Sequence, residues 1–136
     1  MFVDQLSTAE KDILVRVLCE VAQTDQLVSA DEREVITRYA LSLGTPLERI
    51  EAAIHHPEPV DDETLQALPE SSRRVILIEA QTLAMIDGVY GDVERAQVTN
   101  LAARLALEPD VQTQINEYVQ RGFDWAREGA QIVGSA

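Results

Sequence analysis

The chain has 136 residues, enough for one domain with a hydrophobic core, and its 46% apolar and 26% charged content is ordinary for a globular protein. Its 24 acidic residues outnumber 11 lysines and arginines, giving a formal net charge of −13. This balance argues against binding nucleic acid or anionic lipid, because both require clustered basic side chains. It fits a metal cation or a basic protein surface as partner, and it also fits simple solubility.

The cysteine content and the N-terminus bear on the compartment. Cys19 is the single cysteine, so no intrachain disulfide forms, which favours a reducing environment. Residues 1–6 lack the basic and then apolar pattern of a signal peptide. The longest apolar run, residues 75–78, is far too short for a membrane span. We therefore expect a cytoplasmic protein.

Helical periodicity and capping residues predict an all-α fold, since no stretch alternates as a strand should. Capping boxes at residues 7–10 and 29–32 open two helices that end near residues 24–25 and at Gly44. A third capping box, residues 45–48 with Pro46 at the first helical position, opens a short helix ending at residues 55–57.

The second half of the chain is predicted to hold four more helices. They cover residues 61–68 with Asp61 as cap, about 70–86, from 91 or 92 through 105, and from 108 onward. The helix over residues 70–86 is apolar on more than one side, so we expect it at the centre of the bundle. Residues 129–136 are expected to fray.

Residues 21–44 are repeated as residues 83–106. Aligned without a gap, 7 of 24 positions are identical: Ala22/Ala84, Asp25/Asp87, Glu32/Glu94, Arg33/Arg95, Thr37/Thr99, Ala40/Ala102 and Leu43/Leu105. Internal self-similarity of this kind constrains the fold. It predicts one domain over residues 1–136, a bundle of about seven helices built from two pseudo-symmetric helical hairpins, about 8–56 and about 70–128.

Each repeat places an Asp at the end of one helix and a Glu in the first turn of the next. The four acids are Asp25, Glu32, Asp87 and Glu94. If a pseudo-twofold relates the repeats, these carboxylates converge, with Asp31 and Asp92 near enough to contribute. Ligands that are all oxygen suit hard divalent ions such as Ca²⁺, Mg²⁺ or Mn²⁺, although the spacing is not that of an EF-hand loop.

The same acids have a structural interpretation. Glu32 completes the capping box of Ser29, and the two aspartates suit turns in which a side chain bonds backbone amides. Glu94 is less well explained by capping, because its helix opens at Gly91 or Asp92 and the box is incomplete. From the residues alone, both interpretations stay open.

The doubled pattern, in which a helix ending in Asp-Gly is followed by Glu-Arg opening the next, resembles the TerB-like (tellurite-resistance) family over nearly the whole chain. The resemblance implies an all-helical bundle of two pseudo-symmetric halves, no known catalysis, and a role in bacterial tellurite or chemical-stress response. It also implies an acidic cluster that binds a divalent metal, falling here on Asp25, Glu32, Asp87 and Glu94. The first copy departs from the pattern, with Gln26 after Asp25, where a Gly would permit a left-handed turn.

Two further polar features are candidate sites. The only histidines, His55 and His56, lie at a helix C-terminus, which favours their positive charge, although Glu51 one turn earlier would allow a shared metal. Glu79 interrupts an apolar helix face, either as a buried functional acid or as a residue at the edge of the buried stripe.

Cys19 and the C-terminal aromatics have simpler interpretations. Cys19 has no cationic neighbour in sequence, which favours a buried structural thiol. Phe123, Trp125 and Ile132 form either a docking surface or the lid of the core. Without a Gly-rich phosphate loop or a catalytic Ser/His/Asp order, we expect no enzyme. The sequence predicts a TerB-like protein that binds a divalent cation, or alternatively a metal-independent acidic module for protein–protein interaction.

Overall fold

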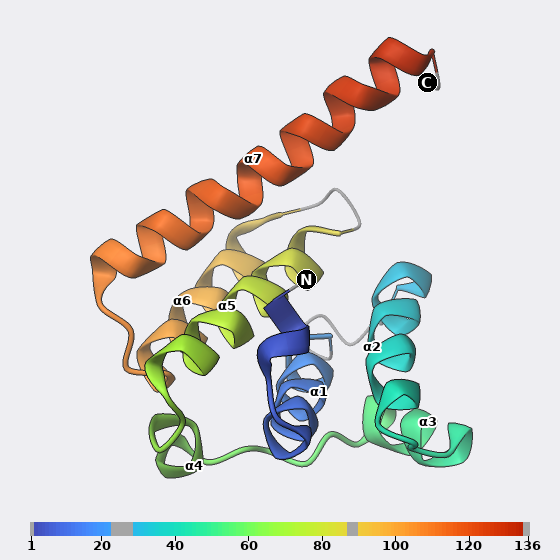
Figure 1. The fold of residues 1–136 in the computed structure, drawn as a ribbon, viewed down its shortest axis with the longest axis vertical. Helices are drawn as coiled ribbons and strands as arrows, with labels where there is room; N and C mark the ends of the chain where they lie inside the picture. The colour runs from blue at the N-terminus through green and yellow to red at the C-terminus, as the bar shows by residue number, and fades with distance from the viewer. Residues whose placement is uncertain (1, 23–28, 87–89, 135–136) are drawn as a thin grey trace.

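The computed structural model describes residues 2–22, 29–86 and 90–134, and Figure 1 shows them as a set of packed helices. A short 3-10 helix, η1 (Phe2–Gln5), precedes the α-helices. The described α-helices are α1 (Thr8–Ala22), α2 (Ala30–Ser42), α3 (Leu47–His55), α4 (Asp62–Gln66), α5 (Glu70–Met85), α6 (Asp92–Arg104) and α7 (Pro109–Val133). Within these ranges there is no strand, so the all-α prediction is confirmed.

Local capping explains where two of these helices begin. In α1, Ser7 Oγ accepts the Glu10 N–H at 3.1 Å, and Glu10 Oε1 accepts the Ser7 N–H at 2.8 Å. In α4, Asp61 Oδ1 accepts the Thr64 N–H at 2.7 Å. Each bond satisfies a backbone donor that lacks a partner inside its helix, as the sequence predicted.

The predicted third capping box, over residues 45–48, is wrong. α3 begins at Leu47, and Pro46 takes the cap position with no side-chain hydrogen bond. Thr45 is used to end α2 instead: its N–H donates to the Ala40 carbonyl at 3.1 Å, beside Gly44 with φ +78°. This arrangement is a Schellman motif, which stops one helix and leaves the next without a side-chain cap.

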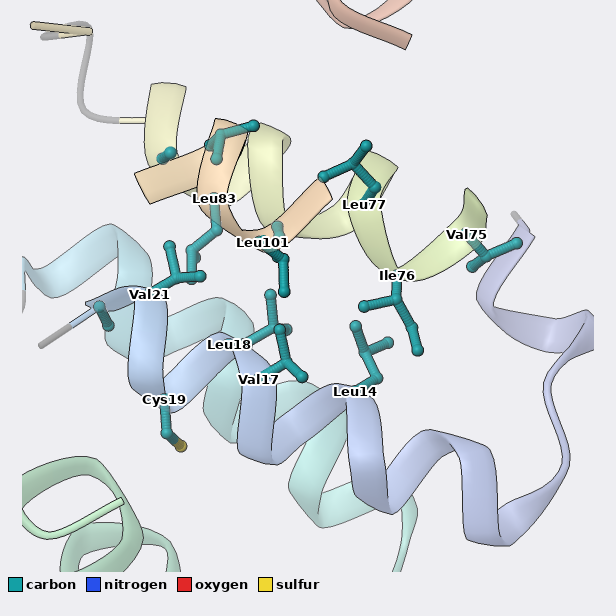
Figure 2. Close-up of a cluster of buried hydrophobic side chains, with 14 of the residues drawn as sticks. Leu14, Val17, Leu18, Cys19, Val21, Val75, Ile76, Leu77, Leu83 and Leu101 are labelled. Carbon is teal, nitrogen blue, oxygen red and sulfur yellow. The ribbon is translucent and has the colours of Figure 1, made fainter. Parts of the chain in front are cut away.

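Helices α1 and α5 pack directly against each other. Figure 2 shows Leu14 opposite Ile76 and Val21 opposite Leu83. Both steps are seven residues along the chain, so the two helices run parallel. All four side chains are at least 93% buried, and burial of this kind stabilises a fold by about 1.5–3 kcal/mol per side chain.

The core is one continuous cluster of buried apolar side chains that draws on η1 and on every α-helix within the described ranges. α5 packs against α1, α6, α7 and η1, so the predicted central position of this helix is confirmed. α1 in turn packs against α2 and α3. The two-hairpin repeat stays a prediction, and the pairing of α1 with α5 is compatible with it.

Helix α7 extends well past the other helices. Figure 1 shows its C-terminal half running away from the bundle, and the helix continues to Val133, so the predicted fraying is wrong for residues 129–133. Gly134, with φ +84°, ends it. Although α7 has 25 residues, no helix in the described parts of the chain is long and apolar enough to cross a membrane.

Candidate functional site: carboxylates at two helix starts

Glu32 lies in the first turn of α2 and is 7% exposed. Its Oε1 accepts the Ser29 N–H at 3.0 Å, and Ser29 Oγ accepts the Glu32 N–H at 3.1 Å. This reciprocal pair is the capping box that the sequence predicted. It fixes the rotamer of a carboxylate that is otherwise costly to bury.

Glu94 has the same position at the start of α6, but only half of the capping arrangement. Its Oε2 accepts the Gly91 N–H at 3.1 Å, and Gly91 has no side chain to return a bond. A Cβ at residue 91 would lie 3.1 Å from the same oxygen, so glycine leaves room for the carboxylate. The predicted incomplete box is therefore confirmed.

Asp25 and Asp87, the other two predicted ligands, lie outside the described residues. The ends of α1 and α5 that lead toward them lie on the same side of the molecule, because the helices run parallel (Figure 2). Asp31 and Asp92 are exposed in the first turns of α2 and α6. Among the residues that the structure describes, no three His, Cys, Asp or Glu side chains are grouped as metal ligands are.

The arginines that follow the two glutamates act differently. Arg95 places its guanidinium 4.7 Å from the centre of the Tyr90 ring, which is a cation–π contact at the start of α6. Burial raises the pKa of Tyr90, and the nearby charge of Arg95 lowers it. Arg33 instead pairs with Glu51 of α3. The aligned Glu-Arg pairs thus share the capping glutamate but not the role of the arginine.

Near the two histidines, the structure shows an ion-pair cluster of Arg33, Glu51 and His55. Glu51 accepts a hydrogen bond from Arg33, which is the main reason that its pKa lies below the ordinary value. The same carboxylate lies 3.7 Å from His55 Nε2. Since Glu51 is already paired with a permanent cation, this group favours the structural interpretation of the two histidines.

Glu79 is a buried acid whose partner the sequence did not reveal. The residue is 6% exposed, and its Oε2 accepts the Tyr39 O–H at 2.7 Å. Burial raises the pKa of the Glu79 carboxyl, partly offset by the Tyr39 hydrogen bond. Glu79 is therefore buried and does not lie at the edge of the buried stripe, and its bond to Tyr39 joins α2 and α5.

Arg104 forms a second internal polar group that the sequence analysis missed. Its guanidinium donates to Glu20 at 3.1 Å, to Asp62 at 2.8 Å and to the Val60 carbonyl. Glu20 also accepts the Val60 N–H at 2.8 Å. One signal was present in the sequence: Glu20 interrupts the apolar face of α1 and, like Glu79, requires a partner there.

Cys19 is 1% exposed, as expected of a structural thiol. Burial, and to a smaller extent the charge of Glu20, raises its pKa to about 11. Thiolate is the reactive form of cysteine, so Cys19 is poorly reactive at neutral pH.

Comparison with models of known protein families, with characterised proteins and with solved structures finds no match for this chain. The resemblance to the TerB-like family therefore rests on the doubled Asp/Glu motif and its spacing.

Proposed function

We propose that this chain is a cytoplasmic, non-enzymatic, TerB-like protein of bacterial tellurite or chemical-stress response. In this proposal it binds a divalent cation through Asp25, Glu32, Asp87 and Glu94. The observation that carries the proposal is the matched placement of Glu32 and Glu94, each held in the first turn of its helix by a backbone N–H. The stress-response role is supported by the family resemblance alone.

The capping bonds are compatible with a second role for these side chains. An ionised carboxylate has about four lone-pair sites, so a capping bond does not by itself exclude a bound cation. The capping bond also holds the group in one orientation, which lowers the entropy that cation binding would cost. Oxygen ligands suit Ca²⁺, Mg²⁺ and Mn²⁺. The parallel arrangement of α1 and α5 supports a shared site, because the described C-terminal ends of both helices lie on one side of the molecule.

Calorimetric titration of chelator-treated protein with each of these ions tests the proposal. We expect micromolar binding in the wild-type chain and its loss in the double variant Asp87→Asn/Glu94→Gln. The matched control is Asp110→Asn/Glu117→Gln, which removes the same charge from exposed positions of α7. Absence of binding, or equal binding by both double variants, would reject the site.

A second function, a metal-independent acidic interaction module, is favoured by a different observation. The capping box accounts for Glu32 without a cation, and α7 leaves Trp125 and Ile132 78% and 79% exposed. In this case the immobilised chain should retain a basic partner in the presence of chelator and release it at high salt. Retention that requires added Ca²⁺, Mg²⁺ or Mn²⁺ would favour the first function instead.

A further inference from the structure

A cavity of about 500 Å³ lies among α1, α2 and α3, apart from the carboxylates described above. Its size falls in the range of small-molecule sites, roughly 300–1,000 Å³. Cys19, Ile36, Ala40 and Ile50 line it, and each is at most 2% exposed. Figure 2 shows the Cys19 side chain pointing from α1 away from α5, so this apolar lining is separate from the α1–α5 contact.

The polar residues around the cavity lie at two ends. Arg49 lies near the start of α3 and His56 directly follows its end, and both line the cavity. Seven residues of helix correspond to a rise of roughly 10 Å. Arg16 belongs to the His56 end, because its guanidinium donates to the Pro59 carbonyl at 3.2 Å. An arginine therefore lines the cavity near either end of α3.

The two ends differ in charge. Asp12 and Glu58 also line the cavity, and both belong to the Arg16 end. Asp12 lies one helical turn before Arg16, and Glu58 directly precedes Pro59. Arg49 has no such neighbour among the lining residues, and in the described parts of the chain it makes no ion pair or side-chain hydrogen bond. Most other arginines have such partners, so Arg49 is an available cation in a chain with net charge −13.

We propose that this cavity binds a medium-chain aliphatic carboxylate, with the carboxylate on Arg49 and the hydrocarbon chain along Ile50, Ile36 and Cys19. An arginine matches a carboxylate with two parallel N–H donors. The hydrocarbon chain gains by leaving water for an aliphatic surface. Thr45, which lines the same end as Arg49, offers a hydroxyl to the second carboxylate oxygen. This proposal is independent of cation binding at the helix starts.

Titration of the intact chain with sodium octanoate, followed by NMR, tests the proposal. We expect saturable shifts of amide signals in α1, α2 and α3, and binding at least about tenfold weaker for octanol, which has no charge for Arg49. Arg49→Gln should weaken octanoate binding by about tenfold and leave octanol binding unchanged. The control Arg38→Gln removes an exposed arginine of α2 that does not line the cavity, and should bind octanoate as the wild type does.

A second variant tests the hydrocarbon part. Ala53→Leu places bulk in the cavity from a half-buried position of α3 and should abolish binding of both probes, with the fold checked by circular dichroism. The proposal fails if octanoate does not bind at millimolar concentration, if Arg49→Gln and Arg38→Gln behave alike, or if Ala53→Leu still binds.

Trp125 provides a check on the location. It is the only tryptophan, and it lines a different groove of about 440 Å³ between α5 and α7. Octanoate in the α1–α2–α3 cavity should leave tryptophan fluorescence unchanged. A change in fluorescence that saturates together with the NMR shifts would place the carboxylate in the other groove and overturn the proposal.

Discussion

Gly44 and Ala106 occupy aligned positions at the ends of α2 and α6, and both have positive φ, 78° and 54°. In each case the following residue closes a Schellman motif, Thr45 onto Ala40 and Leu107 onto Ala102, both at 3.1 Å. Glycine adopts this left-handed conformation without a steric cost, whereas alanine loses about 1–2 kcal/mol in it. The second half of the chain therefore carries backbone strain that the first half avoids.

Ala106→Gly should relieve this strain. We expect the free energy of unfolding to rise by about 0.5–1 kcal/mol, since glycine gives back part of the gain as backbone entropy. The converse change, Gly44→Ala, should lower it by about 1 kcal/mol, because the new Cβ meets nothing within 4 Å and only the backbone conformation matters. Urea unfolding of both variants measures the two effects. A loss of stability in Ala106→Gly would contradict this explanation.

Glu79 makes stability depend on pH. Its pKa is raised above the ordinary value of 4.5 in the folded chain, mainly by burial. The folded state therefore binds the proton more tightly than the unfolded state, and stability falls as pH rises from about 4.5 through the raised value.

Glu79→Gln should remove this dependence while keeping an acceptor for the Tyr39 hydroxyl. We expect the variant to melt at a higher temperature than the wild type at neutral pH, with the difference shrinking as the solution approaches pH 4.5. Thermal melts followed by circular dichroism across this range check it. A variant less stable than the wild type at neutral pH would mean that the charged form of the Glu79–Tyr39 bond is favoured.

At the scale of elements, Arg104 joins three separate parts of the chain. It connects α6 to Glu20 of α1, to Asp62 of α4 and to the segment before α4. Arg104→Gln should lower the free energy of unfolding by about 2 kcal/mol, because Glu20 would then lose its charged partner in a partly buried position.

The control for Arg104 is Arg74→Gln. Arg74 pairs with Glu70 at 3.0 Å inside a single helix, with both side chains about half exposed. Solvent screens exposed pairs of this kind, so we expect Arg74→Gln to change stability much less than Arg104→Gln. Urea unfolding that gives equal losses for the two variants would show that the Arg104 contacts do not tie the helices together.

Two aromatic residues of α7, two positions apart, differ in their packing against the core. Phe123 packs against the core cluster, whereas Trp125 is 78% exposed. Phe123→Ala should cost about 1–3 kcal/mol, less than a fully buried phenylalanine, and Trp125→Ala should stay within about 0.5 kcal/mol of the wild type. Thermal melts measure both. A large loss for Trp125→Ala would mean that the helix end is covered in solution, which would support a partner there.

Sequence predicted the elements well where the deciding interactions are local. Ser7, Ser29 and Asp61 cap their helices through residues three positions away, and such pairs are visible in the sequence. Thr45 was misassigned because two local interactions compete for it, and the end of α2 prevails. The end of α7 was also wrong, since one glycine at residue 129 costs only about 1 kcal/mol in a helix, and the stop comes at Gly134.

Long-range polar contacts were not predictable in the same way. Glu20 and Arg104 are 84 residues apart, and Tyr39 and Glu79 are 40 apart. An acid in an apolar helix face indicates that a partner exists, but tertiary packing selects it. The candidate site shows the same limit. The capping box of Glu32 and the incomplete box of Glu94 were predicted from local sequence, whereas convergence of the four carboxylates depends on how the two halves pack.

At the scale of the whole molecule, α1 and α5 meet through aligned positions. Leu14 faces Ile76 and Val21 faces Leu83, and each pair is related by the 62-residue offset of the sequence repeat. Contact between equivalent residues of two parallel helices is what a pseudo-twofold axis along them produces. This geometry brings the ends of both helices to one side and makes a single shared cation site the natural form of the proposed function.

Paramagnetic line broadening by Mn²⁺, recorded by NMR on chelator-treated protein, locates a bound cation directly. At substoichiometric Mn²⁺, we predict that amide signals of residues 29–33 and 91–95 broaden together and before all others. Added Mg²⁺ should reverse the broadening of both groups of signals in parallel. Broadening of only one of the two groups, or broadening that also spreads over acidic positions of α7, would contradict a shared site. Glu32 and Glu94 would then act as helix caps.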